Sequence, residues 1–357
     1  MTPGDRQNEW FQPAFEQAEV VLFLSANDYY VPYLSALLQS IVEHSSSGRL
    51  YDIIVLQKDI TEHNQQLLAG QTASASNISI RFCDIIAKSD GFDGVFVHQN
   101  FSIETYYRLL IPQMFPAFDK ALYLDCDMVV QADIADLFDV DVQGYLLAAC
   151  RDADSAGLYN GYLLRKRSYI DNVLKLKRPF DYFQAGTLVC NLDEFRASYT
   201  TEEMLSYAFE RDWELMDQDV LNHLAEGRVK FIDMSWNVMV DWAGVRVKDI
   251  IALAPDDLQA EYAKARKRPR AIHYAGPEKP WQNPESDFAD VFWSYERKTP
   301  FFDEAINRMH ADKAGHSAED QLSASQKALE AILPVGSSRR ANAAKLYSRM
   351  HRGDGDE

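Results

Sequence analysis

The stretch Ala-Leu-Tyr-Leu-Asp-Cys-Asp-Met-Val-Val, residues 121–130, places two carboxylates one residue apart at the end of an apolar run. Such a run is typical of a strand that is covered on both faces of a sheet. Side chains two residues apart on an extended chain point the same way, so Asp125 and Asp127 can converge on one hard cation. Because two like charges so close repel each other, a metal ion or a proton must neutralise them. The alternative is a pair of turn aspartates that caps the next helix.

The composition favours an acidic protein with one large domain and additions. The chain has 357 residues, of which 47% are hydrophobic, and a formal net charge of −18. This charge argues against nucleic acid as a partner, because phosphate contacts need a basic surface. It leaves room for a phosphorylated ligand that is held by a metal ion and a few local cations.

Cysteine usage and hydropathy indicate a cytoplasmic protein. Cys83, Cys126, Cys150 and Cys190 are widely spaced and form no Cys-x-x-Cys pair. A zinc site or a disulfide framework is therefore unsupported, and a reducing compartment fits better. The N-terminus lacks the apolar core of a signal peptide, and no run approaches the roughly 18 apolar residues that a spanning helix needs.

Strands and helices alternate along most of the chain. Apolar runs predict strands at 20–25, 51–56, 78–83, 121–124, 146–150 and 183–191, and helical spacing predicts helices at 34–42, 61–68 and 213–226. This alternation predicts an α/β, Rossmann-like domain with a mainly parallel central sheet. The polar stretch 255–270, which ends in the basic run 264–270, is expected to be a solvated loop.

The pattern weakens beyond about residue 300, so we expect a domain at 18–300 followed by a helical, partly basic appendage at 301–357. Residues 311–328 are rich in Ala, Ser and charge, which predicts a loose helix or linker. Residues 337–352 carry basic side chains and no acid beside a few apolar ones. Such a tail could dock on anionic lipid at the inner face of the plasma membrane. The alternative is a frayed, solvated terminus.

Four separated segments together resemble the retaining glycosyltransferases of family 8, which includes bacterial lipopolysaccharide galactosyl- and glucosyltransferases and the glycogenins. The segments are 23–30; 102–109 with 120–127; 182–186 with 191–192 and 217–222; and 273–281. Their order and spacing cover about residues 20–285. The resemblance implies a nucleotide-diphospho-sugar transferase fold of the GT-A type and a uridine diphosphate sugar as donor.

The resemblance also implies a metal site formed by Asp125, Asp127 and His273. Two carboxylates and an imidazole suit Mn²⁺ better than Mg²⁺, which prefers oxygen and water throughout, so Mg²⁺ is the second choice. Taken alone, His273 would be an ordinary strand-end histidine. The sequence Gly-Pro-x-Lys-Pro-Trp at 276–281 makes the metal-binding role the better interpretation.

The expected donor contacts follow from the same motifs. The loop 26–30 would seat uracil and ribose, with Tyr30 stacking on the base, and Gly276 and Lys279 would hold the diphosphate. Many family members have an acid where Asn27 stands and Asn where Gln184 stands, which leaves the base and the sugar open. The donor-binding residues implied are Ala26, Asn27, Tyr30, Arg108, Asp125, Cys126, Asp127, Asp152, Gln184, Ala185, Asp217, Gln218, His273, Gly276 and Lys279.

Asp217, Gln218 and Asp219 are the expected catalytic residues. An amide is a poor nucleophile, so a covalent route through Gln218 is hard to write. We expect transfer on one face of the sugar, with the leaving-group oxygen taking the acceptor proton while Gln218 steadies the cationic transition state. Asp219 is the nucleophile to consider if the route is covalent.

The function that these inferences predict is transfer of glucose or galactose from its uridine diphosphate sugar, with retention, to a cell-surface glycan or lipopolysaccharide-type acceptor. One alternative is a glycogenin-like protein that glycosylates one of its own 18 tyrosines. A phosphatase of the haloacid dehalogenase type usually carries Asp-x-Asp after its first strand, whereas here several elements come first. A nucleotidyltransferase would carry a Gly-rich basic loop after its first strand, and the loop after Leu24 has neither Gly nor Lys.

Overall fold

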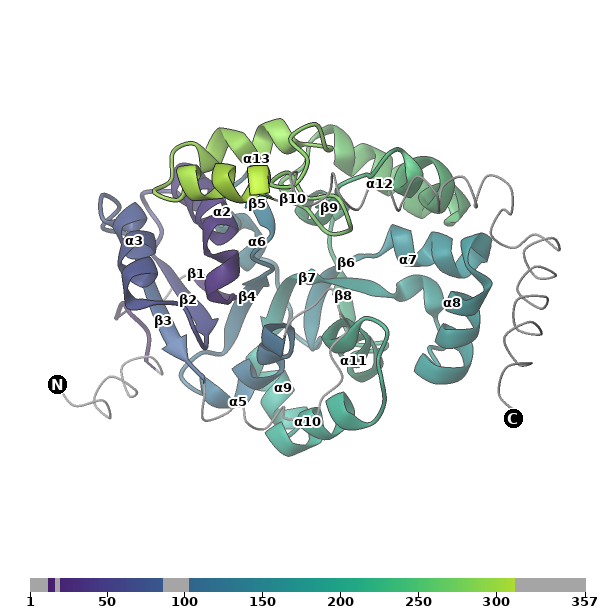
Figure 1. Ribbon diagram of the computed structural model, residues 1–357. Coiled ribbons are helices and arrows are strands. Elements are labelled where there is room, and N and C mark those ends of the chain that lie inside the picture. The colour runs from purple at the N-terminus through teal and green to yellow at the C-terminus, as the bar shows by residue number, and fades with distance from the viewer. Residues whose placement is uncertain (1–11, 17–19, 86–102, 312–357) are drawn as a thin grey trace, which may run out of the picture. The chain divides into compact units, whose positions relative to one another are not determined.

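The computed structural model of the chain describes residues 12–16, 20–85 and 103–311 (Figure 1). The chain divides into two compact units, residues 1–305 and 306–357, and all elements below belong to the first. The basic stretch 337–352, and all of 311–328 except Ala311, lie outside the described residues. The domain boundary near residue 300 and the nature of the appendage therefore stay predictions.

Within the described residues, a seven-stranded sheet has the order β3-β2-β1-β4-β7-β6-β8, and a three-stranded sheet has the order β5-β10-β9. Neighbours in the large sheet are parallel except at β7, which is antiparallel to both β4 and β6. The predicted α/β class with a mainly parallel sheet is thus confirmed. The strands are β1 (Val20–Ser25), β2 (Tyr51–Gln57), β3 (Ile78–Asp84), β4 (Lys120–Leu124), β5 (Met128–Val130), β6 (Leu147–Arg151), β7 (Phe183–Asn191), β8 (Val229–Phe231), β9 (Val238–Met239) and β10 (Ala271–His273).

Helices cover both faces of the large sheet. Figure 1 shows α2 and α13 on one side of it and α9, α10 and α11 on the other. No helix in the described part of the chain is long and apolar enough to cross a membrane. The α-helices are α2 (Val31–His44), α3 (Glu62–Thr72), α5 (Ile111–Met114), α6 (Ile134–Phe138), α7 (Ala153–Gly157), α8 (Leu164–Tyr169), α9 (Leu192–Ser198), α10 (Thr201–Phe209), α11 (Met216–Leu224), α12 (Asp256–Lys267) and α13 (Ala289–Glu296).

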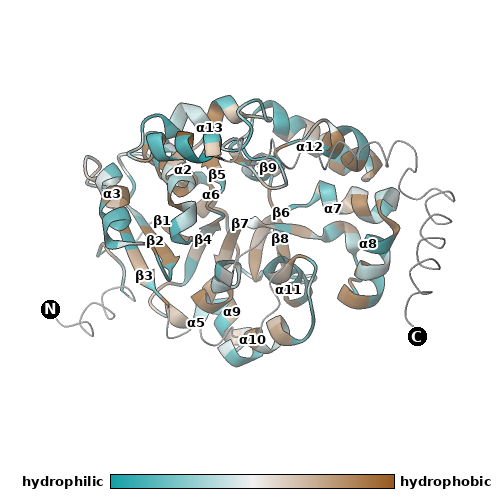
Figure 2. Ribbon diagram, in the orientation of Figure 1, coloured by the Kyte–Doolittle hydropathy of each residue, from teal (hydrophilic) through white to brown (hydrophobic). Residues whose placement is uncertain are grey.

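Alternate residues of each central strand enter different cores. In β1, Leu22 and Leu24 pack with α2 residues such as Leu34, whereas Phe23 packs with the aromatic and aliphatic side chains on the opposite face. Because both faces are covered, these strands are mostly apolar, and much of the sheet appears brown in Figure 2. This burial is the physical reason why the apolar runs predicted the strands correctly.

The Asp-Cys-Asp sequence is the turn at which the chain leaves the large sheet for the small one. Strand β4 ends at Leu124, and β5 begins at Met128 and pairs antiparallel with β10, so that Met128 lies opposite His273. The helix that follows, α6, is capped by Asp133, whose side chain accepts from the N–H of Ala135. The alternative that the aspartate pair caps the next helix is therefore wrong.

The polar stretch 255–270 is largely helical, so the predicted loop is wrong. Helix α12 (Asp256–Lys267) buries Leu258, Tyr262 and Ala265, which recur at helical spacing on one face. Acids in its first turn and bases in its last turn favour the helix dipole. The basic run thus completes a helix, and its narrow apolar face is easily overlooked in so polar a segment.

Glu296 gives the fold a testable pH dependence. It is fully buried at the end of α13, where its Oε2 accepts from the hydroxyl of Ser35 in α2 at 3.3 Å. Burial raises the pKa of Glu296 to about 8, although hydrogen bonds from Ser35 and Thr299 act in the opposite direction. From about pH 5 to pH 8 the folded state therefore binds one proton more than the unfolded chain, and its stability falls as pH rises through this window.

We expect Glu296→Gln to remove this pH dependence. The melting temperature of the variant minus that of the wild type should increase steadily from pH 5 to pH 8, by the equivalent of about 1.4 kcal/mol per pH unit at most. The control is Glu43→Gln, for which this difference should stay constant. Burial raises the pKa of this partly exposed carboxyl, but Lys298 and Gln39 together keep it below its usual value. A constant difference for Glu296→Gln across this range would contradict the assignment.

Candidate active site

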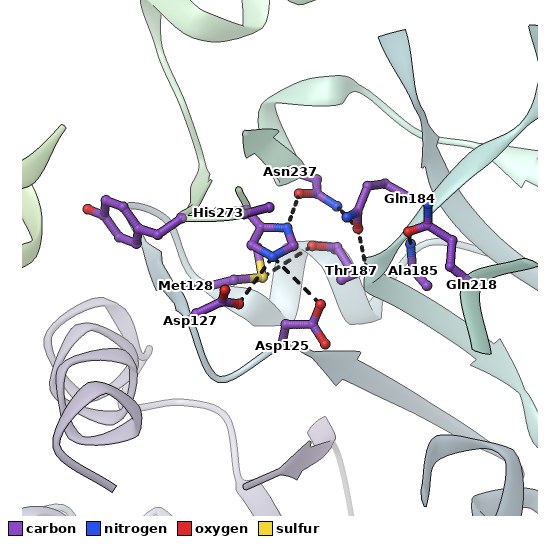
Figure 3. Close-up of polar contacts among 12 residues, drawn as sticks. Asp125, Asp127, Met128, Gln184, Ala185, Thr187, Gln218, Asn237 and His273 are labelled. Atoms are coloured by element: carbon purple, nitrogen blue, oxygen red, sulfur yellow. Dashed lines mark hydrogen bonds and ion pairs between the residues drawn. The ribbon is translucent and has the colours of Figure 1, made fainter. Parts of the chain in front are cut away.

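The three predicted metal ligands come together where the two sheets meet (Figure 3). Ligand atoms of Asp125, Asp127 and His273 all lie within 4.8 Å of one another. His273 Nε2 lies 3.1 Å from Asp127 Oδ1 and 3.6 Å from Asp125 Oδ2. Two hard oxygens and one nitrogen that converge in this way can hold one divalent cation.

Each carboxylate of this cluster pairs one oxygen with a basic side chain, and its other oxygen faces His273. Arg108 bonds Asp125 Oδ1 at 2.7 Å, and Lys279 bonds Asp127 Oδ2 at 2.7 Å. Burial alone raises the pKa of Asp127, but Lys279 and His273 lower it far more, so it lies well below its usual range. Asp127 is therefore ionised at neutral pH, and each carboxylate presents one oxygen for a metal ion.

Asn237 orients the imidazole, and this residue was not predicted from the sequence. His273 Nδ1 lies 2.9 Å from Asn237 Oδ1, while Asn237 Nδ2 donates to Gln184 Oε1 at 3.1 Å. Because the amide N–H of Asn237 faces Gln184, its oxygen accepts the Nδ1 proton of His273. Nε2 then faces the two carboxylates and is the nitrogen that would bind a metal ion.

We expect Asn237→Ala to weaken metal binding about 10- to 100-fold, because the imidazole loses the partner that fixes its tautomer and ring orientation. Mn²⁺ affinity measured by electron paramagnetic resonance checks this. Asn172→Ala is the matched control, since Asn172 is exposed and donates to Ser168 one turn away. Unchanged Mn²⁺ affinity in Asn237→Ala would show that the imidazole needs no such partner.

Gly186 provides the space in which the metal ligands meet. A Cβ atom at this position would lie 2.4 Å from His273 Cε1, 2.7 Å from His273 Nδ1 and 2.8 Å from Asp125 Oδ2. The carbonyl of Gly186 also accepts from the N–H of Asp125 at 2.9 Å. Gly186 stands in one of the quoted motifs, but the sequence did not show that two metal ligands pack against its Cα.

Arg108, predicted to contact the donor, is a buried side chain that links site residues to one another. It lies in the 3-10 helix η3 (Ile103–Leu110) and donates to Asp125 Oδ1 and, at 2.6 Å, to the carbonyl of Ala185. Its Nε also forms an ion pair with Asp217 Oδ2 at 2.8 Å. Burial raises the pKa of Asp217 to about 6, although Arg108 and Thr105 oppose this rise. A direct bond from Arg108 to the donor stays a prediction.

Ala185 joins the metal cluster to the predicted catalytic residues. Its carbonyl accepts from Arg108, and its N–H donates to Gln218 Oε1 at 2.9 Å. The amide of Gln218 therefore lies beside the strand that carries Gln184 and Ala185 (Figure 3). Asp219 follows it in α11 but is fully buried, so its carboxylate is enclosed by protein rather than presented to a ligand.

The loop predicted to seat the nucleoside begins the helical segment after β1. Asn27 Oδ1 accepts from the N–H of Tyr30 at 3.1 Å, and Ala26 is buried. Tyr30 contacts Tyr33 and Trp281 edge to face, and Tyr33 stacks on Trp281 with ring centroids 3.8 Å apart. This aromatic contact ties the loop that carries Lys279 to the loop predicted to seat the nucleoside.

The remaining predicted residues have mainly local contacts. Gly276 has φ +119°, a conformation that side chains disfavour, and it packs against Arg246 and Trp242. Cys126 is half-buried between the two aspartates. Asp152 is buried and caps α7, accepting from the N–H and the hydroxyl of Ser155 at 2.9 Å each. Contacts of these residues with a donor stay predictions.

Residues 21–285 match the family model described as glycosyl transferase family 8. A putative glycosyltransferase of Haemophilus influenzae is 25% identical over 264 residues, which cover 73% of this chain and 72% of that protein. The WbbM bifunctional glycosyltransferase, in its apo structure, is 31% identical with a TM-score of 0.75. That match covers 84% of this chain and 53% of the WbbM chain, so this chain spans about half of the bifunctional protein.

The galactosyltransferase LgtC, solved in complex with donor and acceptor sugar analogues, has a TM-score of 0.64 at 24% identity. That match covers 79% of this chain and 96% of LgtC, and at this identity it shows the GT-A type fold alone. Together with the metal cluster, these likenesses set aside the phosphatase and nucleotidyltransferase alternatives. The chain belongs to glycosyl transferase family 8 and is a glycosyltransferase.

Proposed function

We propose that this glycosyltransferase transfers glucose or galactose from a uridine diphosphate sugar, with retention of configuration, to a hydroxyl of a cell-surface glycan or lipopolysaccharide-type acceptor. The observation that carries the proposal is the group of Asp125, Asp127, His273 and Lys279, which places an ammonium group beside a candidate cation site. A diphosphate needs both, because its charge must be neutralised as the sugar leaves.

Asp125, Asp127 and His273 would hold Mn²⁺, which would supply Lewis-acid stabilisation of the leaving diphosphate. Arg108 holds Asp125 in place through an ion pair. Lys279 lies 2.7 Å from Asp127 Oδ2 on a flexible side chain, so a short movement would carry its ammonium group to a phosphate oxygen. Trp281, stacked on Tyr33, anchors the loop while Lys279 moves.

Retention is supported by the environment of the catalytic candidates. Gln218 presents an amide, which is a poor nucleophile, and Asp219 is enclosed by protein. A route without a covalent intermediate then requires attack on the face that the diphosphate leaves, with a leaving-group oxygen accepting the proton of the acceptor hydroxyl. Gln218 would place its amide dipole against the positive charge that develops on the sugar. Asp217, held by Arg108 and Thr105, would bond sugar hydroxyls.

Gln184 is the side chain that we expect to reach towards the donor sugar. Gln184 bonds Asn237 and the backbone of Gly186, so its amide is fixed beside the metal ligands. The segment 156–180, which contains α8, would border the acceptor.

We also propose a cytoplasmic location with peripheral contact of 337–352 to anionic lipid. Substituting the basic residues of that stretch by glutamine should then abolish binding to anionic vesicles.

The test is donor turnover across a panel of nucleotide hexoses, with Mn²⁺ and then with a chelator. We expect Mn²⁺-dependent release of UDP from one uridine diphosphate hexose and retention in the product, read by NMR of the anomeric proton. Intact mass before and after incubation distinguishes transfer to an added acceptor from self-glycosylation. No binding of any nucleotide sugar in either condition would overturn the proposal.

A further inference from the structure

The carboxylate of Asp219 is the centre of a fully enclosed hydrogen-bond network behind the catalytic candidate Gln218. Asp219 is 0% exposed and accepts from three donors. The hydroxyl of Tyr182 donates to Oδ1 at 2.6 Å, the hydroxyl of Tyr169 donates to Oδ2 at 2.6 Å, and the N–H of Leu215 donates to Oδ2 at 2.8 Å. The hydrogen-bonding capacity of this carboxylate is used by groups of the protein, which suits a structural role better than that of a nucleophile.

This network determines the direction of the Tyr182 hydroxyl. Burial, followed by the charge of Asp219, raises the pKa of Tyr182 well above its usual value, so the phenol keeps its proton. Because that proton is given to Asp219, the oxygen of Tyr182 can only accept from other groups. The group that it meets is Gln218 Nε2, which lies 3.1 Å away.

The direction of the Tyr182 hydroxyl in turn fixes the amide of Gln218. With Nε2 on the Tyr182 side, Oε1 accepts from the N–H of Ala185 at 2.9 Å. A flipped amide would place its oxygen against a phenol oxygen and its NH₂ against a backbone N–H, so both hydrogen bonds would be lost. The carbonyl end of the amide is therefore held at Ala185, a residue expected to bind the donor.

We propose that Asp219 and Tyr182 are positioning residues, which act through Gln218 by holding its amide in the one orientation that directs its carbonyl end to the sugar side. The inference rests on the proposed function, in which Gln218 faces the developing positive charge. The oxygen end of the amide stabilises that charge, whereas the NH₂ end would repel it. Asp219 thus contributes without touching the substrate.

The chain contains a matched pair of phenols for the test. Tyr169 and Tyr182 are both buried, and both donate to Asp219 at 2.6 Å, but only Tyr182 also accepts from Gln218. Tyr169→Phe and Tyr182→Phe therefore remove the same kind of bond from the same carboxylate. A merely structural role predicts similar losses of melting temperature and of activity in the two variants.

We expect Tyr182→Phe to lower kcat about tenfold with the KM for the donor within twofold of the wild type, and Tyr169→Phe to stay within twofold in both. In a Gln218→Ala background, Tyr182→Phe should cause no further loss of kcat, because the amide through which it acts is gone. Equal kcat in the two Phe variants, or a Tyr182→Phe loss that persists in the Gln218→Ala background, would overturn the inference.

The variant Asp219→Asn and the activity of the wild type complete the test. If Tyr182→Phe does not fold, Asp219→Asn carries the same test, since a side-chain amide facing Tyr182 reverses that phenol and with it the preferred direction of Gln218. Asp219→Asn should then lower kcat in the wild-type background and not in Gln218→Ala. Failure of the proposed function is recognised separately, because the wild type itself would then transfer no hexose from any uridine diphosphate sugar.

Discussion

Asp127→Asn is expected to lower kcat at least about a thousandfold and to abolish measurable Mn²⁺ binding. Asp127 Oδ1 faces His273 Nε2, and its other oxygen bonds Lys279, so the substitution removes a metal ligand and the counter-ion of a lysine together. Loss of a Lewis-acid metal removes several kcal/mol of transition-state stabilisation, and each 1.36 kcal/mol corresponds to a factor of ten. Donor turnover and electron paramagnetic resonance of Mn²⁺ measure the two effects independently.

The control for this variant is Asp139→Asn, which removes an exposed carboxylate that pairs with Arg49. It should leave kcat and Mn²⁺ binding unchanged. Activity of Asp127→Asn within tenfold of the wild type, in the presence of a chelator, would show that transfer does not depend on a cation at this cluster. Lys279 would then have to neutralise the leaving diphosphate alone.

Gly186→Ala is expected to reduce Mn²⁺ affinity and kcat about a hundredfold or more while the protein stays folded. The added methyl group would lie 2.4 Å from the His273 ring and 2.8 Å from Asp125 Oδ2, so at least one ligand must move. The carbonyl of Gly186 accepts from the N–H of Asp125, and β7 pairs with β4 from Thr187 onwards, so a backbone shift would break these bonds and we expect the ligands to yield instead. A displacement of about 1 Å in such a site costs about a hundredfold in rate.

Gly70→Ala is the matched control, since a Cβ at Gly70, in α3, would meet nothing within 4 Å. Alanine favours the helix there, so this variant should be slightly more stable and fully active. Circular dichroism and melting temperature confirm that each variant folds. Normal Mn²⁺ affinity in Gly186→Ala would show that the metal ligands adapt to the methyl group, and the importance assigned to this glycine would be wrong.

The central strands and the aspartate pair could be predicted from the sequence because their signals are local. An apolar run reports a strand that is buried on both faces, and the spacing of Asp125 and Asp127 reports the side to which they point. The position of His273 could be predicted only through the family resemblance. Nothing local in residues 271–273 shows that β10 lies antiparallel to β5.

The supporting residues could not be predicted because their roles arise from contacts between distant segments. Asn237 matters because β9 and β10 are neighbours, which brings it to the ring of His273. Arg108 carries the charge expected of a donor-binding residue, yet it is buried and forms ion pairs with Asp125 and Asp217, which lie in other segments of the chain. For α12 the difficulty was different, since a helix that buries only Leu258, Tyr262 and Ala265 has too few apolar positions to stand out in a polar segment.

The two basic side chains attached to the candidate metal carboxylates would make the binding of a metal ion and of a donor cooperative. At their formal charges, Asp125, Asp127 and Asp217 together with Arg108 and Lys279 sum to −1. A divalent cation would change this balance to +1, and a diphosphate with two negative charges would return it to −1. Each ligand therefore improves the electrostatic setting for the other, and the coupling is reciprocal. The protein would load its metal mainly when the donor is present, and the departure of the nucleotide product would loosen the metal in turn.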